Sequence, residues 1–112
     1  MNVDEVVYGL ILELRRGTLI LLVLGQMGKP TYGYSLVKQL NDCQIPMDAN
    51  TLYPLLRRLE GQGLLESQWD TAQGKPRKYY QITPMGQEVL EKTKAYWKTF
   101  SNQVDKLLEG SV

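Results

Sequence analysis

The residues best able to do chemistry in this chain are basic and polar side chains that gather in two segments. One segment holds three cations within four positions, and these are Lys75, Arg77 and Lys78. The other holds polar or aromatic side chains followed by two cations, in the order Asn50, Thr51, Tyr53, Arg57, Arg58. Side chains of these types donate hydrogen bonds to phosphate oxygens and to the edges of bases. The two segments therefore predict a surface that binds nucleic acid.

The composition excludes the common catalytic routes. The 112 residues include no histidine, which removes Ser-His-Asp catalysis and histidine-based zinc sites. Cys43 is the only cysteine, so no internal disulfide can form, and we expect it to be a small core or helix-end residue. Asp48 and Glu60 form no evident carboxylate pair, and no glycine-rich phosphate loop occurs. We therefore expect no enzyme activity, no catalytic or metal-binding residues and no cofactor.

The formal net charge of +1 hides an uneven distribution of charge along the chain. Residues 1–48 carry a net charge of −1, residues 49–82 carry +2, and residues 83–112 are neutral. The positive excess therefore coincides with the two segments that contain the candidate binding residues.

The chain carries no pattern typical of secretion or of a membrane protein. Its first residues are acidic where a signal peptide would be positive. The most apolar run covers only residues 19–24, whereas a helix that spans a bilayer needs about 20 apolar residues. We expect a cytoplasmic protein without membrane contact.

The first part of the chain predicts a helical arm followed by a core helix. Apolar residues recur at helical spacing through residues 3–27, and Gly17 and Thr18 interrupt them. Because threonine is a good N-cap, we expect a short leading helix or arm and then a core helix over residues 18–27. The Gly-Lys-Pro sequence that follows ends this helix.

Two further helical patterns follow. The first covers residues 31–43. The second begins at Asp48 or Asn50, both good N-caps, and ends at Gly61 or Gly63.

The next segment changes to the period of a β-hairpin. Residues 64–69 and 78–82 are rich in β-forming residues, and residues 70–76 form the loop between them. The basic segment thus lies at the tip of the hairpin and in its second strand. Because side chains alternate along a strand, one of Tyr79 and Tyr80 faces inward and the other outward.

A long helix is predicted at the C-terminal end. Thr83 and Pro84 are a suitable N-cap and first helical residue. A helix from Met85 to Leu108 is about 36 Å long, more than the rest of a small domain can cover. Its apolar stripe therefore needs another surface. The apolar positions are Val89, Leu90, Trp97, Phe100, Val104, Leu107 and Leu108.

Taken together, these elements predict a mainly α fold with a small β-hairpin, namely a winged helix-turn-helix plus a long C-terminal dimerisation helix. In such motifs the second helix enters the major groove, so the helix that begins near Asn50 is the candidate reading helix. Two alternatives stay open: Asn50 and Thr51 only cap this helix while its arginines face solvent, and the basic hairpin is only a soluble turn. The expected core residues are Leu21, Leu22, Leu36, Leu40, Leu52, Leu56, Leu59 and Ile82.

Three motifs in order resemble the PadR family of transcriptional regulators. They are YGYSL at 32–36, TLYPLLRRLEGQGL at 51–64 and PRKYYQIT at 76–83. The similarity runs from about residue 17 to residue 91, and the single C-terminal helix is similar to the smaller of the family's two size classes.

The resemblance implies a cytoplasmic homodimer that binds double-stranded DNA. Residues 17–82 would form the DNA-binding domain and residues 83–112 the dimerisation helix, with a contribution from residues 1–16. Pattern and resemblance together give the DNA-binding residues Ser35, Asn50, Thr51, Tyr53, Pro54, Arg57, Arg58, Lys75, Arg77 and Lys78. The expected dimerisation residues are Val89, Val104, Leu107 and Leu108.

Some small members of that family bind flat aromatic molecules between the two C-terminal helices, where a tryptophan stacks on them. Trp97 matches that region, and Tyr96 and Phe100 lie beside it in sequence. The alternative is that Trp97 simply belongs to the core of the dimer seam.

The expected function is a sequence-specific DNA-binding regulator, a repressor that acts as a homodimer on a pseudo-palindromic operator and is released by a small aromatic effector. The alternative is a winged-helix module that binds proteins and never contacts DNA. Residues 1–16 are more apolar than the family's usual short leader, so we expect this arm to enlarge the dimer interface.

Overall fold

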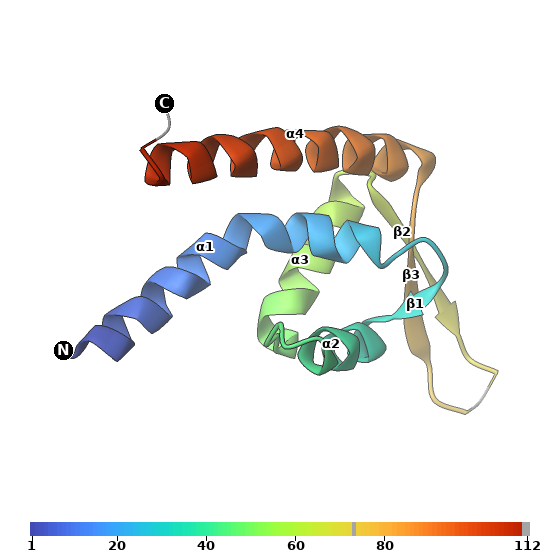
Figure 1. Ribbon diagram of the computed structural model, residues 1–112. Helices are drawn as coiled ribbons and strands as arrows, with labels where there is room; N and C mark the ends of the chain where they lie inside the picture. The colour runs from blue at the N-terminus through green and yellow to red at the C-terminus, as the bar shows by residue number, and fades with distance from the viewer. Residues whose placement is uncertain (73, 111–112) are drawn as a thin grey trace.

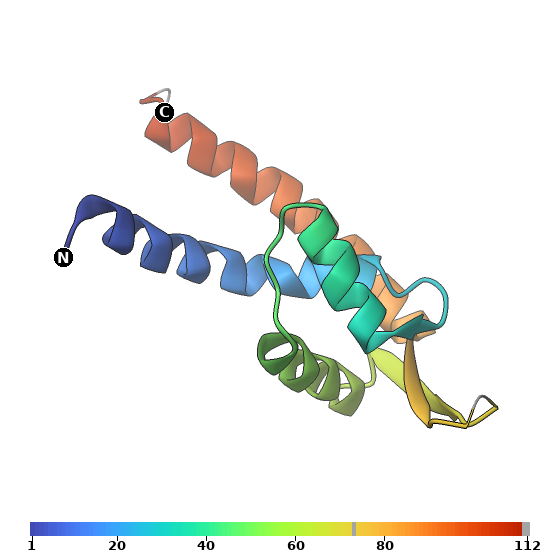
Figure 2. The same cartoon turned by 90° about the horizontal axis from the view of Figure 1, so that it is seen from below.

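The computed structural model describes residues 1–72 and 74–110. In these residues the elements follow in the order α1 (Val3–Gly25), β1 (Thr31–Tyr32), α2 (Gly33–Asp42), α3 (Ala49–Gly61), β2 (Leu65–Asp70), β3 (Arg77–Ile82) and α4 (Pro84–Leu108). Figure 1 shows the hairpin β2–β3 at one end of the molecule and the free ends of α1 and α4 at the other. The two long helices lie together near α3 and diverge toward their free ends, as Figures 1 and 2 both show.

The break expected within the first helix is wrong. α1 runs without interruption through Gly17 and Thr18, and the Thr18 hydroxyl donates to the Arg15 carbonyl at 2.9 Å instead of capping a new helix. A glycine inside a helix costs only about 1 kcal/mol relative to alanine. Packing of the next two turns offsets that cost, because Val23 and Leu24 are fully buried.

The second helix begins two residues later than expected, because Thr31 and Tyr32 form the short strand β1. These residues pair antiparallel with Tyr80 and Tyr79 of β3. The hairpin predicted from the sequence is therefore part of a three-stranded sheet in the order β1-β3-β2.

The third helix, α3, begins after the predicted N-cap Asp48 and ends at the predicted Gly61. The Asp48 carboxylate caps it and accepts a hydrogen bond from the Thr51 N–H at 2.8 Å. At its other end Gly63 adopts a φ of 80°, and the Leu64 N–H donates to the Leu59 carbonyl. This is a Schellman motif, in which glycine avoids the steric cost of a left-handed backbone. It turns the chain directly into β2.

The core lies between α2, α3, the end of α1 and the inner face of the sheet. Five of the expected core residues are buried, namely Leu36, Leu40, Leu52, Leu56 and Leu59. Leu21, Leu22 and Ile82 are only half-buried, and of these three Leu21 and Ile82 pack against the core. The end of α1 instead buries Val23 and Leu24, and Met27, just beyond the helix, is also buried. Cys43 is exposed at the C-cap of α2, which confirms its helix-end placement.

The last helix, α4, begins as predicted. The Thr83 hydroxyl accepts from the Gly86 N–H at 2.9 Å, and Pro84 is the first helical residue. Gly86 lies directly against the backbone of the α3–β2 connection, since a Cβ atom here would lie 2.1 Å from the Leu64 carbonyl oxygen. Only glycine allows this close approach. Gly86 therefore sets the point where α4 leaves the body of the domain.

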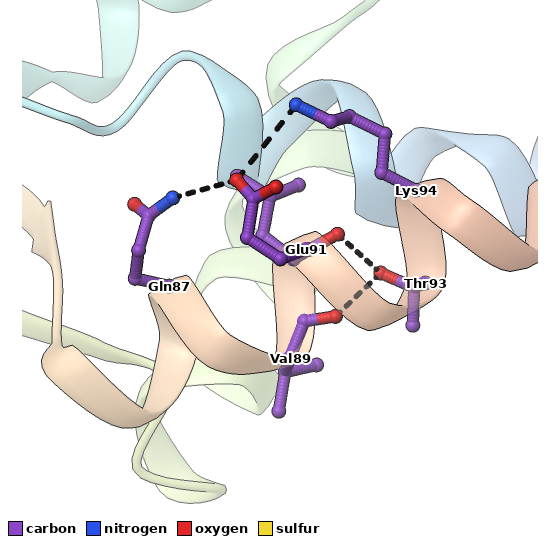
Figure 3. A network of polar contacts seen from close by, with 6 residues as sticks. Gln87, Val89, Glu91, Thr93 and Lys94 are labelled. Carbon is purple, nitrogen blue, oxygen red and sulfur yellow. Dashed lines mark hydrogen bonds and ion pairs between the residues drawn. The ribbon is translucent and has the colours of Figure 1, made fainter.

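The first half of α4 is held by local polar contacts (Figure 3). The Glu91 carboxylate accepts a hydrogen bond from Gln87 and lies 3.7 Å from the Lys94 ammonium. The Thr93 hydroxyl donates to the Val89 carbonyl at 2.8 Å. This half packs on its own chain through Leu90, which is buried.

We call residues 3–14 of α1 and residues 96–108 of α4 the free halves of these helices. Unlike the first half of α4, they expose large apolar side chains. On α4 these are Tyr96, Trp97, Phe100, Leu107 and Leu108. On α1 they are Val3, Val6, Val7, Tyr8, Leu10, Ile11, Leu12 and Leu14. An exposed apolar surface of this extent is typical of a contact with another protein.

Candidate nucleic-acid interface

The exposed face of α3 gathers most of the predicted reading residues. Leu52, Leu56 and Leu59 hold the opposite face in the core. The helical period then leaves a second set exposed on one side, namely Asn50, Thr51, Pro54, Arg57 and Arg58. This arrangement confirms that these side chains share a solvent-facing surface.

The start of α3 is poorly suited to a phosphate. Asp48 places a carboxylate at this helix end and already binds the Thr51 N–H. A phosphate here would meet a like charge, which opposes the attraction of the helix dipole. The cations further along α3 are better placed to receive DNA. Arg57 and Arg58 are exposed and form no ion pair with any described residue.

Tyr53 holds α2 and α3 together. A Cβ atom on Gly33 would lie 2.9 Å from Cε1 of the Tyr53 ring, so the ring packs against the bare backbone at the start of α2. Burial, with smaller contributions from Tyr32 and Tyr80, raises the pKa of Tyr53 above its usual value of 10.0. The hydroxyl therefore stays protonated at neutral pH and can act as a hydrogen-bond donor.

We define the wing as β2, β3 and the connection between them. The three predicted cations lie in three different places on it. Lys75 is exposed in the connection. Arg77 is exposed on the outer face of the sheet, where its Cζ atom lies 5.4 Å from the centre of the Tyr32 ring. Lys78 points to the inner face and lies 3.5 Å from the Glu60 carboxylate. The three charges thus do not form one patch.

The two adjacent tyrosines of β3 face opposite ways, as the strand period predicts. Tyr80 is buried in the core. Tyr79 lies on the outer face, with its ring centre 5.8 Å from that of Tyr32. Of the two, Tyr79 is therefore the one on the solvent side of the wing.

Ser35 is exposed in the first turn of α2, at a crevice that also contains Arg77 and Lys29. Lys29 was not among the predicted residues. Its loop carries no motif, and only the pairing of β1 with β3 brings it near the wing. The crevice therefore adds one cation, Lys29, to the edge of the predicted surface.

The residues predicted for an effector site are all exposed on α4. The rings of Tyr96 and Phe100 are stacked, with centres 5.6 Å apart and an angle of 11° between their planes. Trp97 is 42% exposed beside them. Among the predicted dimerisation residues, Leu107 and Leu108 are exposed, whereas Val104 is half-buried and Val89 packs partly against its own core.

Two other kinds of site are absent from residues 1–72 and 74–110. No group of three or more histidine, cysteine, aspartate or glutamate side chains in this part of the chain is arranged to hold a metal ion. None of its helices is long and apolar enough to cross a bilayer.

Comparison with known proteins decides the family. Residues 20–92 match the transcriptional regulator PadR-like family. The chain belongs to this family. A transcriptional regulator of Mycobacterium tuberculosis is 32% identical over 73 residues, which cover 65% of this chain and 68% of that protein.

Solved structures of PadR proteins share the fold. A PadR family regulator from Eggerthella lenta is 57% identical, with 95% of each chain covered and a TM-score of 0.91. A PadR-like transcription factor from Bacteroides fragilis is 32% identical, covers 88% of this chain and 98% of its own, and has a TM-score of 0.74. The predicted winged helix-turn-helix with a long C-terminal helix is thereby confirmed. Since 95% of the chain is covered in the first case, most of the apolar arm has a counterpart there.

Membership of the PadR family makes this chain a DNA-binding transcriptional regulator. The family and its solved structures are named for regulation and not for a reaction.

Proposed function

We propose that this PadR-family protein is a repressor that binds a pseudo-palindromic operator as a homodimer. The observation that supports it best is the exposed face of α3, where Arg57 and Arg58 have no acidic partner among the described residues. Lys75, Arg77 and Ser35 are also exposed, the first two on the wing and the third on α2. Arginine reads guanine in the major groove, and exposed lysine neutralises phosphate.

The proposed division of the chain gives residues 17–82 to DNA, and residues 83–112 together with 1–16 to the dimer. The apolar side chains exposed on the free halves of α1 and α4 favour a second copy of the chain as their cover. Two reading helices in such a dimer would contact half-sites about 34–36 Å apart, or a multiple of that spacing. The regulator would act in the cytoplasm, where it meets DNA.

We further propose that a small aromatic molecule releases the operator. The stacked rings of Tyr96 and Phe100 and the exposed Trp97 offer flat surfaces of the kind that such a molecule would stack on. Binding would be followed by quenching of tryptophan fluorescence in a Trp69→Phe background, which removes the signal from the wing.

The test of DNA recognition is selection of bound fragments from the source genome, followed by footprinting. We expect one protected site of two inverted half-sites, and affinity that falls steeply with salt. The alternative, a winged-helix module that binds only proteins, predicts no enrichment of any fragment. A single unpaired half-site would contradict the dimeric mode. Transcription from the recovered promoter, measured with and without the protein, then tests repression.

A further inference from the structure

We propose that Glu60 and Lys78 form a lock that fixes the wing relative to the reading helix, so that Lys78 is a positioning residue and not a phosphate contact. We call Glu60, Ser67 and Lys78 the wing lock. The inference rests on the proposed DNA binding, because its consequence is the placing of two DNA-contacting elements.

The wing lock joins three elements through one carboxylate. Glu60 belongs to the last turn of α3, Ser67 to β2 and Lys78 to β3. The Lys78 ammonium lies 3.5 Å from one Glu60 oxygen, and the Ser67 hydroxyl donates a hydrogen bond to the other. Both charged side chains are about two-thirds buried, with 30% of Lys78 and 31% of Glu60 exposed.

Two aromatic rings also contact the Lys78 ammonium. Its nitrogen lies 5.2 Å from the centre of the buried Tyr80 ring and 5.9 Å from that of Trp69. These distances are typical of cation–π contacts. Partial burial lowers the pKa of Lys78, but Tyr80 and Glu60 outweigh this and raise it above its ordinary value, so the lysine stays charged. Turning this side chain toward DNA would break all of these contacts.

The position of the lock explains why it would matter for binding. Every described residue of the wing from Gln68 to Arg77 is exposed, and beyond the lock Arg77 contacts the body of the domain through the Tyr32 ring of β1. The lock therefore lies where the hairpin leaves α3. Because the wing and α3 would contact different parts of one DNA site, a change in their relative position misplaces one of them.

The two roles of Lys78 predict opposite effects when Glu60 is neutralised. If Lys78 binds phosphate, Glu60→Gln frees a cation and strengthens DNA binding. If Lys78 positions the wing, Glu60→Gln weakens binding and Lys78→Met weakens it equally. The double variant then loses no more than either single variant, since both remove one interaction.

The first experiment measures affinity for the selected DNA fragment across a range of salt concentrations. For Glu60→Gln, Lys78→Met and their combination we expect a loss of about 5-fold each, with the salt slope of the original protein. The matched control is Lys75→Met, an exposed wing cation, which should lower the slope by about 0.9 for each phosphate that the variant no longer neutralises. Tighter binding by Glu60→Gln, or a slope lowered by Lys78→Met, would overturn the proposal.

The second experiment needs no DNA, so it separates failure of the lock from failure of the proposed function. Spin labels are placed at Ala49 and Ala72 in a Cys43→Ser chain diluted with unlabelled protein. We expect Glu60→Gln and Lys78→Met to broaden the distance distribution, whereas Lys75→Met leaves it unchanged. Thermal unfolding of each variant verifies that it is folded. An unchanged distribution in the folded lock variants would also overturn the proposal.

Discussion

The two ends of this molecule expose opposite kinds of side chain. At one end, α3 and the wing present arginines, lysines and small polar groups around a fully buried row of leucines. At the other, the free halves of α1 and α4 present aromatic and aliphatic residues with little local packing. The charged end stays hydrated until a polyanion binds and releases its counterions. Contact with another surface stabilises the apolar end, because it removes apolar side chains from water. The comparison favours DNA at one end and a second chain at the other.

Deletion of residues 2–12 has the largest expected effect, and it tests whether the apolar end of the molecule forms the dimer interface. The residues of α1 that are buried in the chain's own core lie further along, at Val23 and Leu24, so the deleted chain should still fold. Burial of each apolar side chain contributes about 1.5–3 kcal/mol, so loss of several should raise the dimer dissociation constant more than about 100-fold. Sedimentation measures this, with circular dichroism as the control for folding. An unchanged dimer would show that the arm is not part of the interface.

The double variant Arg57→Ala, Arg58→Ala tests the polar end. An arginine that reads a base contributes about 1–3 kcal/mol, so we expect at least a 10-fold loss of affinity together with weaker sequence discrimination. Fluorescence anisotropy with the selected fragment and with a scrambled one measures both. Lys98→Ala, an exposed cation on α4, is the matched control and should bind as before. Equal losses in the control and the double variant would refute a specific role for α3.

Gly86→Ala tests the joint between the two ends. Its new methyl group would meet the Leu64 carbonyl oxygen at 2.1 Å, so α4 must shift away from the body. Overpacking of this kind costs about 1–3 kcal/mol, and urea denaturation should show a lower free energy of unfolding. Gly61→Ala is the control, since nothing lies within 4 Å of its added Cβ and alanine favours a helix. A loss of stability in the control alone would contradict this account of the joint.

The smallest expected effect concerns pH. The pKa of Tyr53 is raised in the folded chain, so the folded state holds this proton more tightly than the unfolded state does. The associated stability is fully present below the unfolded pKa of 10.0 and is lost as pH rises through the folded value. Tyr53→Phe should therefore flatten the decline of the unfolding free energy above pH 10, measured in urea. A decline as steep as that of the original protein would rule out this contribution.

Much of the fold could be predicted because its signals are local. The caps at Asp48 and at Thr83, the helical spacing of the buried leucines and the alternation at Tyr79 and Tyr80 each depend on a few neighbouring residues. The same helical period separated the buried from the exposed face of α3. The sequence pattern wrongly predicted a helix break at Gly17. The small free-energy cost of a glycine inside a helix is outweighed by the packing of a later turn of α1.

Other features could not be predicted, because they depend on residues far apart in the chain. A two-residue strand such as β1 has no period of its own and exists only through pairing with β3. Lys78 carried the same signal as Lys75 and Arg77, since composition alone does not tell which cation meets a carboxylate. Its partner Glu60 lies 18 positions earlier.

The amino-acid sequence by itself determined the order of the three-helix region, the hairpin and the last helix, the absence of histidine chemistry and the exposed character of the α3 surface. These follow from side-chain type and from the periods of 3.6 and 2, which are properties of the chain's immediate neighbourhood. Only the tertiary structure decided that α1 is one helix, that Lys78 pairs with Glu60, and that α1 and α4 diverge with their apolar sides uncovered. The physical reason is that burial and ion pairing depend on contacts between elements that lie far apart in the chain, and no local pattern specifies those contacts.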